Sequence, residues 1–124
     1  PKKDELILRG GDRMLAMLPE WDKGGGGGGN SNWQEGDGGA TNDMYYWYYG
    51  SYAMYQLGEK YWEKWKGAME NAILKNQRTE PPCYDGSWDP GGPWGWSGGR
   101  VYSTALMVLC LEVYFRYGRV LGAR

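Results

Sequence analysis

Residues 76–115 have the sequence NQRTEPPCYDGSWDPGGPWGWSGGRVYSTALMVLCLEVYF. A polar segment ends at Gln77, a crossing rich in tryptophan and glycine follows, and a long apolar segment comes last. Four prolines predict a loop rather than a helix over 78–97: Pro81, Pro82, Pro90 and Pro93. Apolar residues surround the helical wheel of 98–117, which predicts an enclosed helix that ends near Gly118. The loop is therefore either a catalytic loop or a structural clasp between helices.

Two helices are predicted before this loop. Residues 43–58 can begin with an N-cap at Asp43 or Asn42 and end with Gly58 in the left-handed helical conformation. Aromatic side chains cover nearly all sides of this helix, which indicates burial on more than one face. Residues 59–77 are amphipathic at the helical period, and one face carries Tyr61, Trp62, Trp65, Met69, Ala72, Ile73 and Asn76.

The N-terminal third is less regular. Residues 1–20 form a helical segment that Gly10 and Gly11 interrupt, so the helix is expected to begin near Asp12 as its N-cap and to end at Pro19. Residues 21–42 contain six consecutive glycines, which favours a flexible connector. A phosphate cradle is disfavoured because no Lys-Ser/Thr pair opens the next helix. Residues 119–124 are assigned as a C-terminal tail.

Composition excludes several classes of function. The 124 residues suffice for one domain, and 14 basic against 15 acidic side chains provide no field for nucleic acid. No apolar run is long enough to span a membrane. Histidine is absent, which excludes a Ser-His-Asp triad and an imidazole zinc site. Cys83 and Cys110 are interpreted as free thiols, Cys110 as a core residue, and neither indicates a compartment.

Asn76-Gln77 at the end of the amphipathic helix, DGSW at 85–88 and VYSTALMVLCLEVYFRYG at 101–118 together resemble the QW repeat of the squalene–hopene cyclase and protein prenyltransferase β superfamily. Residues 43–118 also look like the cyclase-like repeat proteins of planctomycetes and other bacteria, whose Asp-x-Tyr-Tyr-Trp-Tyr-Tyr-Gly segment is similar to DMYYWYYG at 43–50. The resemblance implies an all-α fold, a partial α/α toroid. Its inner helices would be 43–58 and 98–117, and 59–77 would be an outer helix.

The same resemblance implies a structural clasp made of Gln77, Asp85, Gly86 and Trp88. In the family the glutamine side chain reaches the N-terminus of the following inner helix, and the tryptophan stacks on it. A helix start leaves about four backbone N–H groups without intrahelical partners, so a buried start needs acceptors. Here the segment RTEPPCY lengthens the usual spacing between the glutamine and DGSW.

The chemistry of the superfamily has few counterparts in this chain. The Asp-x-Asp-Asp cluster of the cyclases, the histidine of the prenyltransferase zinc site and the Gly-Cys-Gly-Glu-Gln of the thioester toroids are all absent. Asp43 is the one catalytic candidate, at the start of an inner helix, where a lone Asp more commonly serves as an N-cap. Asp85 and Asp89, with the carbonyls of Gly91 and Gly92, are candidate calcium ligands, although turn-forming Asp residues are commoner. No cofactor is predicted.

Three functions are consistent with these features. Three or four helices cannot close a ring, so the inner helices would expose apolar surface. This favours a non-catalytic structural or protein-interaction module, whose partner is the remainder of a parent chain, another subunit or a second copy. The alternatives are the aromatic cavity wall of an isoprenoid cyclase or prenyltransferase-like enzyme, and a glycan or lipid module. The candidate surface residues are Tyr45, Tyr46, Trp47, Tyr49, Trp94 and Trp96.

Overall fold

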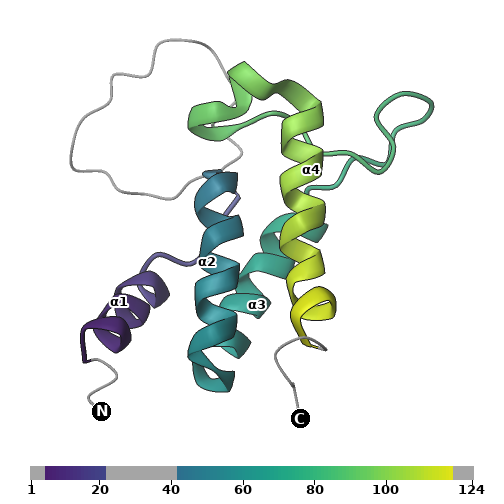
Figure 1. Ribbon diagram of the computed structural model, residues 1–124. Helices are drawn as coiled ribbons and strands as arrows, with labels where there is room; N and C mark the ends of the chain where they lie inside the picture. Colours follow the sequence, from purple (N-terminus) through teal and green to yellow (C-terminus); the bar gives the residue numbers. More distant parts are fainter. Residues whose placement is uncertain (1–4, 22–41, 119–124) are drawn as a thin grey trace.

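A computed structural model describes residues 5–21 and 42–118 of the chain (Figure 1). The described part contains four helices and no strand, which confirms the all-α prediction. They are α1 (Glu5–Leu15), α2 (Met44–Leu57), α3 (Glu59–Leu74) and α4 (Gly92–Gly118). The glycine run of the predicted connector, within 22–41, and the C-terminal tail at 119–124 lie outside the described residues.

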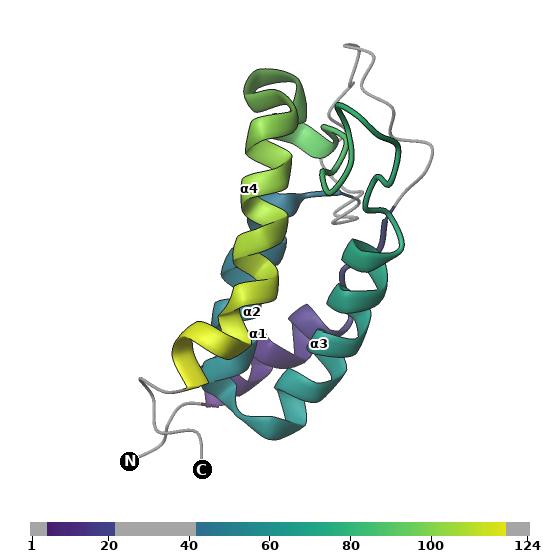
Figure 2. The ribbon, with the colours of Figure 1, turned by 90° about the vertical axis from the view of Figure 1, so that its right-hand side faces the viewer.

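The helices form two layers. α2 and α4 run side by side in the same direction, and α3 returns in the opposite direction behind them (Figure 1). The orthogonal view separates the α2–α4 layer from α3 (Figure 2). α1 packs against both α2 and α3 at one side. α2 therefore has neighbours in both layers, whereas one long side of α4 has none of the other three described helices against it.

Local signals explain the ends of α2 and α3. The Asp43 carboxylate accepts a hydrogen bond from the backbone N–H of Tyr46 at 3.1 Å, so the predicted N-cap is confirmed. Gly58 joins α2 to α3 with a φ of 102°, a conformation that favours glycine, but its ψ of −179° is not that of the predicted left-handed helical residue. The amphipathic prediction for α3 is confirmed, because six of the seven residues on its apolar face are buried.

α1 differs from its prediction. It begins at Glu5 and continues through Gly10 and Gly11, instead of starting at Asp12. Gly11 lies against the next helices so closely that a Cβ there would approach the Leu57 Cδ1 atom to 2.7 Å. The glycine thus permits helix packing, and Asp12 accepts a hydrogen bond from the Tyr61 hydroxyl at 3.1 Å instead of capping a helix.

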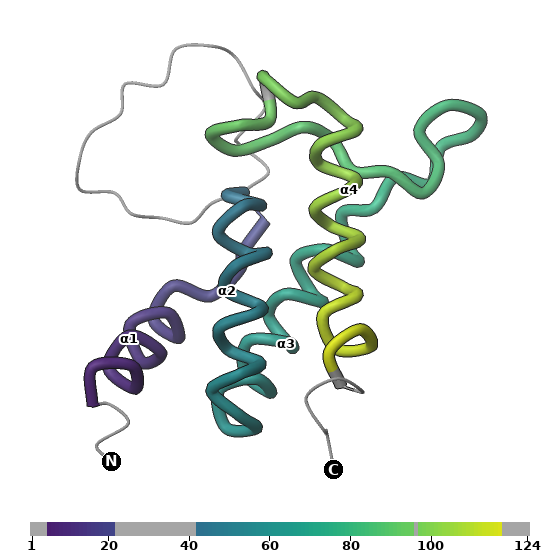
Figure 3. The backbone as a smooth tube through the Cα atoms, in the orientation of Figure 1, coloured from purple at the N-terminus to yellow at the C-terminus, as the bar shows by residue number. Residues whose placement is uncertain are grey.

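α4 also begins earlier than predicted, at Gly92 instead of Gly98. Pro93 lies in its first turn, where a missing N–H breaks no intrahelical bond. A kink at Gly99, with φ 64° and ψ −160°, separates this short segment from the long apolar one (Figure 3). The loop prediction for 78–97 is therefore wrong over 92–97. None of the helices within 5–21 and 42–118 has the length and apolarity needed to cross a bilayer.

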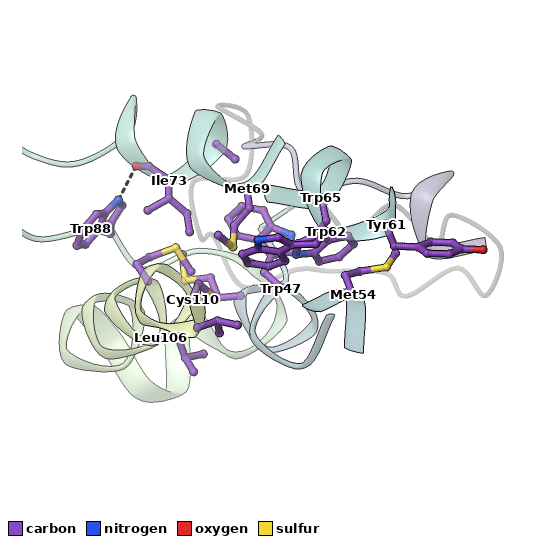
Figure 4. Close-up of a cluster of buried hydrophobic side chains, with 14 residues drawn as sticks. Trp47, Met54, Tyr61, Trp62, Trp65, Met69, Ile73, Trp88, Leu106 and Cys110 are labelled. Carbon is purple, nitrogen blue, oxygen red and sulfur yellow. Dashed lines mark hydrogen bonds between the residues drawn. The ribbon is translucent and has the colours of Figure 1, made fainter. Parts of the chain in front are cut away.

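The core lies between the two layers and is dominated by indole and thioether side chains (Figure 4). At its centre the Ser51 hydroxyl donates to the Trp47 carbonyl oxygen at 2.7 Å and accepts from Trp65 Nε1 at 2.9 Å. A buried polar group is costly unless it is hydrogen-bonded. Ser51 therefore supplies the acceptor that the Trp65 indole N–H needs in an apolar core. Gly50 admits the Trp65 ring, since a Cβ at 50 would lie 2.4 Å from its Cζ2 atom.

Candidate interaction surface

Trp88 connects the loop after α3 to both layers. Its side chain is buried, and its indole Nε1 donates to the carbonyl oxygen of Ile73 at 2.7 Å (Figure 4). Its backbone N–H donates to Thr104 Oγ1 of α4 at 3.3 Å. Carbonyl groups in the last turn of a helix lack the usual partners four residues on, and the Ile73 carbonyl accepts from both the indole and the Asn76 backbone N–H, which is 3.2 Å away. Trp88 therefore ties the end of α3 to the loop and to α4.

The other three residues of the predicted clasp lie on the exposed part of the same loop. The Gln77 amide Nε2 donates to the Gly86 carbonyl oxygen at 3.1 Å, a contact within the loop and not with a helix start. Backbone bonds between Arg78 and Gly86 and between Ser87 and Arg78, each 2.8 Å, close the loop, and Gly86 has a positive φ of 78°. Asp85 is exposed beside Gly86. The structure thus brings Gln77 and Gly86 into contact, 9 residues apart.

The carboxylate of Asp89 lies between two guanidinium groups. Arg78 Nη2 is 2.6 Å from Oδ2, and Arg100 Nη2 of α4 contacts Oδ1. The hydrogen bond from Arg78 is the largest cause that lowers the pKa of Asp89 below its usual value. Both carboxylate oxygens of Asp89 are thus engaged by guanidinium groups. Within the described part of the chain, no three acidic, cysteine or histidine side chains gather in a way that could hold a metal.

The six predicted surface residues separate into different environments. Trp47 belongs to the core, and the Tyr46 hydroxyl donates to the Met17 carbonyl oxygen at 3.2 Å in a half-buried position. Tyr45 and Tyr49 are 47% and 54% exposed on the outer side of α2. Trp94 is exposed in the first segment of α4. Trp96 lies in the same segment, but its side chain is outside the described part.

α4 carries several exposed apolar side chains, and of the large hydrophobic residues elsewhere in the described part only Leu6 of α1 is exposed to a similar extent. Val101 and Phe115 are 82% and 76% exposed, and Val108 between them is exposed as well. The three positions are seven residues apart, so they lie on one side of the helix. Ala105 and Glu112 complete this row, which we call the α4 stripe: Val101, Ala105, Val108, Glu112 and Phe115. Glu112 is the only charged residue in the stripe and pairs with Arg116 at 3.6 Å.

The α4 stripe contradicts the prediction of an enclosed helix over 98–117. The opposite side of α4 is buried, including Met107, Cys110 and Val113, but the stripe faces away from both α2 and α3. A helical wheel with apolar residues on every side shows only that each side of the helix could be buried. The seven-residue spacing of the stripe was visible in the sequence, whereas its lack of cover depends on the tertiary arrangement.

The described residues contain no evident catalytic arrangement. Asp43 is used as a helix cap. Burial raises the pKa of the Cys110 thiol to about 12, so this cysteine is a neutral core residue at ordinary pH. Cys83 is exposed, and both cysteines are free thiols, as predicted.

Comparisons with known proteins assign this chain to no family. A scan against protein-family models, a search of curated proteins and a search of solved structures each gave no match.

Proposed function

We propose that this chain is a non-catalytic protein-interaction module, built from helical repeats of the type found in terpene cyclases and protein prenyltransferases. The α4 stripe carries the proposal. Two large apolar side chains on it are more than three-quarters exposed, and burial of such a side chain contributes about 1.5–3 kcal/mol. A row of this kind on a packed helix marks a surface that another protein covers.

The partner that we propose is a second copy of the chain. Val101 and Phe115 lie seven residues on either side of Val108. In an antiparallel pair of α4 helices with a two-fold axis at Val108, Val101 of each copy packs against Phe115 of the other, and Val108 against Val108. A two-fold interface requires such self-complementarity. The small side chain of Ala105 allows close approach, and a net charge of −1 gives little repulsion between copies.

The local architecture is consistent with a repeat module. Two helices in the same direction, α2 and α4, with an antiparallel α3 behind them, form the unit that an α/α toroid would repeat. The Trp88 contacts hold the end of α3 against α4 and so keep the stripe-bearing helix in place. We assign no isoprenoid chemistry to this unit, because the one acid at an inner-helix start, Asp43, caps that helix.

The mass of the full chain in solution, by light scattering after size exclusion, tests the proposal. The wild type is expected as a dimer, and Val108→Glu as a monomer with an unchanged helical circular dichroism spectrum, because a charge at the two-fold axis faces its own copy. Leu74→Glu is the matched control. Leu74 is an exposed apolar residue of α3, and its variant should remain dimeric. A monomeric wild type, or a Val108→Glu dimer, would overturn the proposed partner.

A further inference from the structure

Tyr45 and Tyr49 form a close pair of phenols one turn apart on α2. Their ring centroids are 4.9 Å apart with an interplanar angle of 58°, and their hydroxyl oxygens are 3.4 Å apart. Residues four apart in a helix share one face, so the backbone holds the two rings together. Both rings are about half exposed. A small or protein-sized reagent in solution can therefore reach the pair.

We propose that Tyr45 and Tyr49 are an oxidative modification site, at which a peroxidase-class one-electron oxidant couples the two rings into dityrosine. Each phenol loses one electron and its hydroxyl proton. The two radicals then form one carbon–carbon bond between the positions ortho to oxygen. The hydrogen on each of these carbons moves to the adjacent oxygen, which restores both aromatic rings. Hydrogen peroxide accepts the two electrons and two protons and is reduced to two molecules of water.

The orientation of the pair suits this bond. The hydroxyl oxygens are 3.4 Å apart, and each ortho carbon is bonded to the carbon that carries the hydroxyl, so the ortho carbons of the two rings are also brought close. The tilt between the rings is also compatible with a twisted biaryl product. Two groups held in contact react with a far higher effective concentration than groups on separate molecules. Coupling within one chain should therefore exceed coupling between chains.

The neighbouring tyrosines are less suitable. Tyr48 meets Tyr49 and Tyr52 in edge-to-face contacts at 63° and 86°, which direct the edge of one ring at the face of the other. Tyr52 and Tyr117 have centroids 4.4 Å apart, but they are half-buried in the seam between α2 and α4, where a protein oxidant has less access. This pair is the main competitor.

Two other exposed tyrosines serve as internal controls. Tyr84 lies under the Arg100 guanidinium, 4.5 Å from its ring centroid, and Tyr114 packs edge-on against Phe115 at 5.3 Å. Neither of these neighbours is a phenol. They are about as exposed as Tyr45 and Tyr49. They therefore show how far an exposed tyrosine reacts when no second phenol lies beside it. The site does not depend on the α4 stripe or on self-association.

The experiment treats the full chain with peroxidase and limiting hydrogen peroxide, and records dityrosine fluorescence and intact mass. The wild type should lose two hydrogen atoms per chain without a change in subunit number. Tyr45→Phe and Tyr49→Phe should each reduce the fluorescence about fivefold or more, whereas Tyr84→Phe should match the wild type. Peptide mapping after trypsin separates the competitors, since Lys60 lies between Tyr52 and Tyr117 in the sequence.

The expected product is a cross-link within the single tryptic peptide that contains both Tyr45 and Tyr49. A cross-link that joins two peptides at Tyr52 and Tyr117 would overturn the proposal. Fluorescence that survives in both single Phe variants, or a product that is only intermolecular, would also overturn it. The oligomeric mass of the untreated chain tests the proposed function separately, so the two proposals can fail independently.

Discussion

At the scale of single residues, Trp88 is the most informative side chain. The sequence predicts that it belongs to a clasp with Gln77, and the structure buries it between α3, the loop and α4. Its indole N–H satisfies a carbonyl at the end of α3, while the Gln77 amide stays within the exposed loop. A buried hydrogen bond with a large apolar ring contributes more than an exposed amide contact.

Trp88→Phe should lower the free energy of unfolding by about 1–3 kcal/mol, because the buried hydrogen bond from the indole to the Ile73 carbonyl is lost and the smaller ring leaves a space. Urea unfolding followed by circular dichroism measures the difference. Trp94→Phe, at an exposed position in the first segment of α4, is the matched control and should stay close to the wild type. Equal losses for both variants would contradict the assigned role of Trp88.

At the scale of elements, glycines determine how closely the helices approach. Gly11 lets α1 pack on Leu57 and Tyr61, and Gly50 lets α2 accept the Trp65 ring. Gly11, which the sequence analysis interprets as an interruption, is therefore a contact point, and so is Gly50. Gly67, in contrast, lies on the exposed side of α3, where an added Cβ would meet nothing within 4 Å. The same residue type thus has opposite effects in two helices.

Gly50→Ala should destabilise the protein by about 1–3 kcal/mol, since the new methyl group overlaps a buried indole in a close-packed core. Gly67→Ala should stabilise it by about 0.5–1 kcal/mol, because alanine loses less backbone entropy in a helix. Thermal unfolding of the two variants beside the wild type measures both effects. Shifts of the same sign would show that helix propensity, and not the Trp65 contact, dominates at Gly50.

At the scale of the whole molecule, the described helices form a two-layer core that buries α2 and α3 on their facing sides and leaves the α4 stripe exposed. Cys110 lies at the α4 side of that core, and its thiol has a pKa raised to about 12 by burial. The thiolate is the reactive form, so a thiol of this pKa is protonated and unreactive at pH 8. Its reactivity therefore reports opening of the core.

A thiol reagent at pH 8 should modify the exposed Cys83 rapidly in the native protein and Cys110 only after unfolding. Counting modified thiols against time, with and without urea, gives one fast site in the native state and two in the unfolded state. In Cys83→Ser the fast reaction should disappear. Rapid modification of Cys110 in the folded Cys83→Ser variant would show that the two layers separate readily.

Sequence periodicity and end signals account for the parts of the fold that depend on neighbouring residues. The Asp43 cap, the buried face of α3 and the core position of Cys110 follow from local pattern and composition. The early start of α4 also has a local cause, since Pro93 is tolerated in a first helical turn. The start of α4 at Gly92 could have been predicted, because a proline in the first turn of a helix does not prevent that helix from forming.

What the sequence determined by itself is the helical character of the chain, the amphipathic face of α3, the free thiols and the absence of histidine chemistry. Only the tertiary structure decided that Gly11 is a packing contact and that Trp88 donates to the end of α3. It also decided that Tyr45 and Tyr49 are exposed while Trp47 is buried, and that no other described helix covers the α4 stripe. The reason is physical. Periodicity specifies which side of a helix can be buried, but burial itself requires a second element, and its position is set by long-range packing.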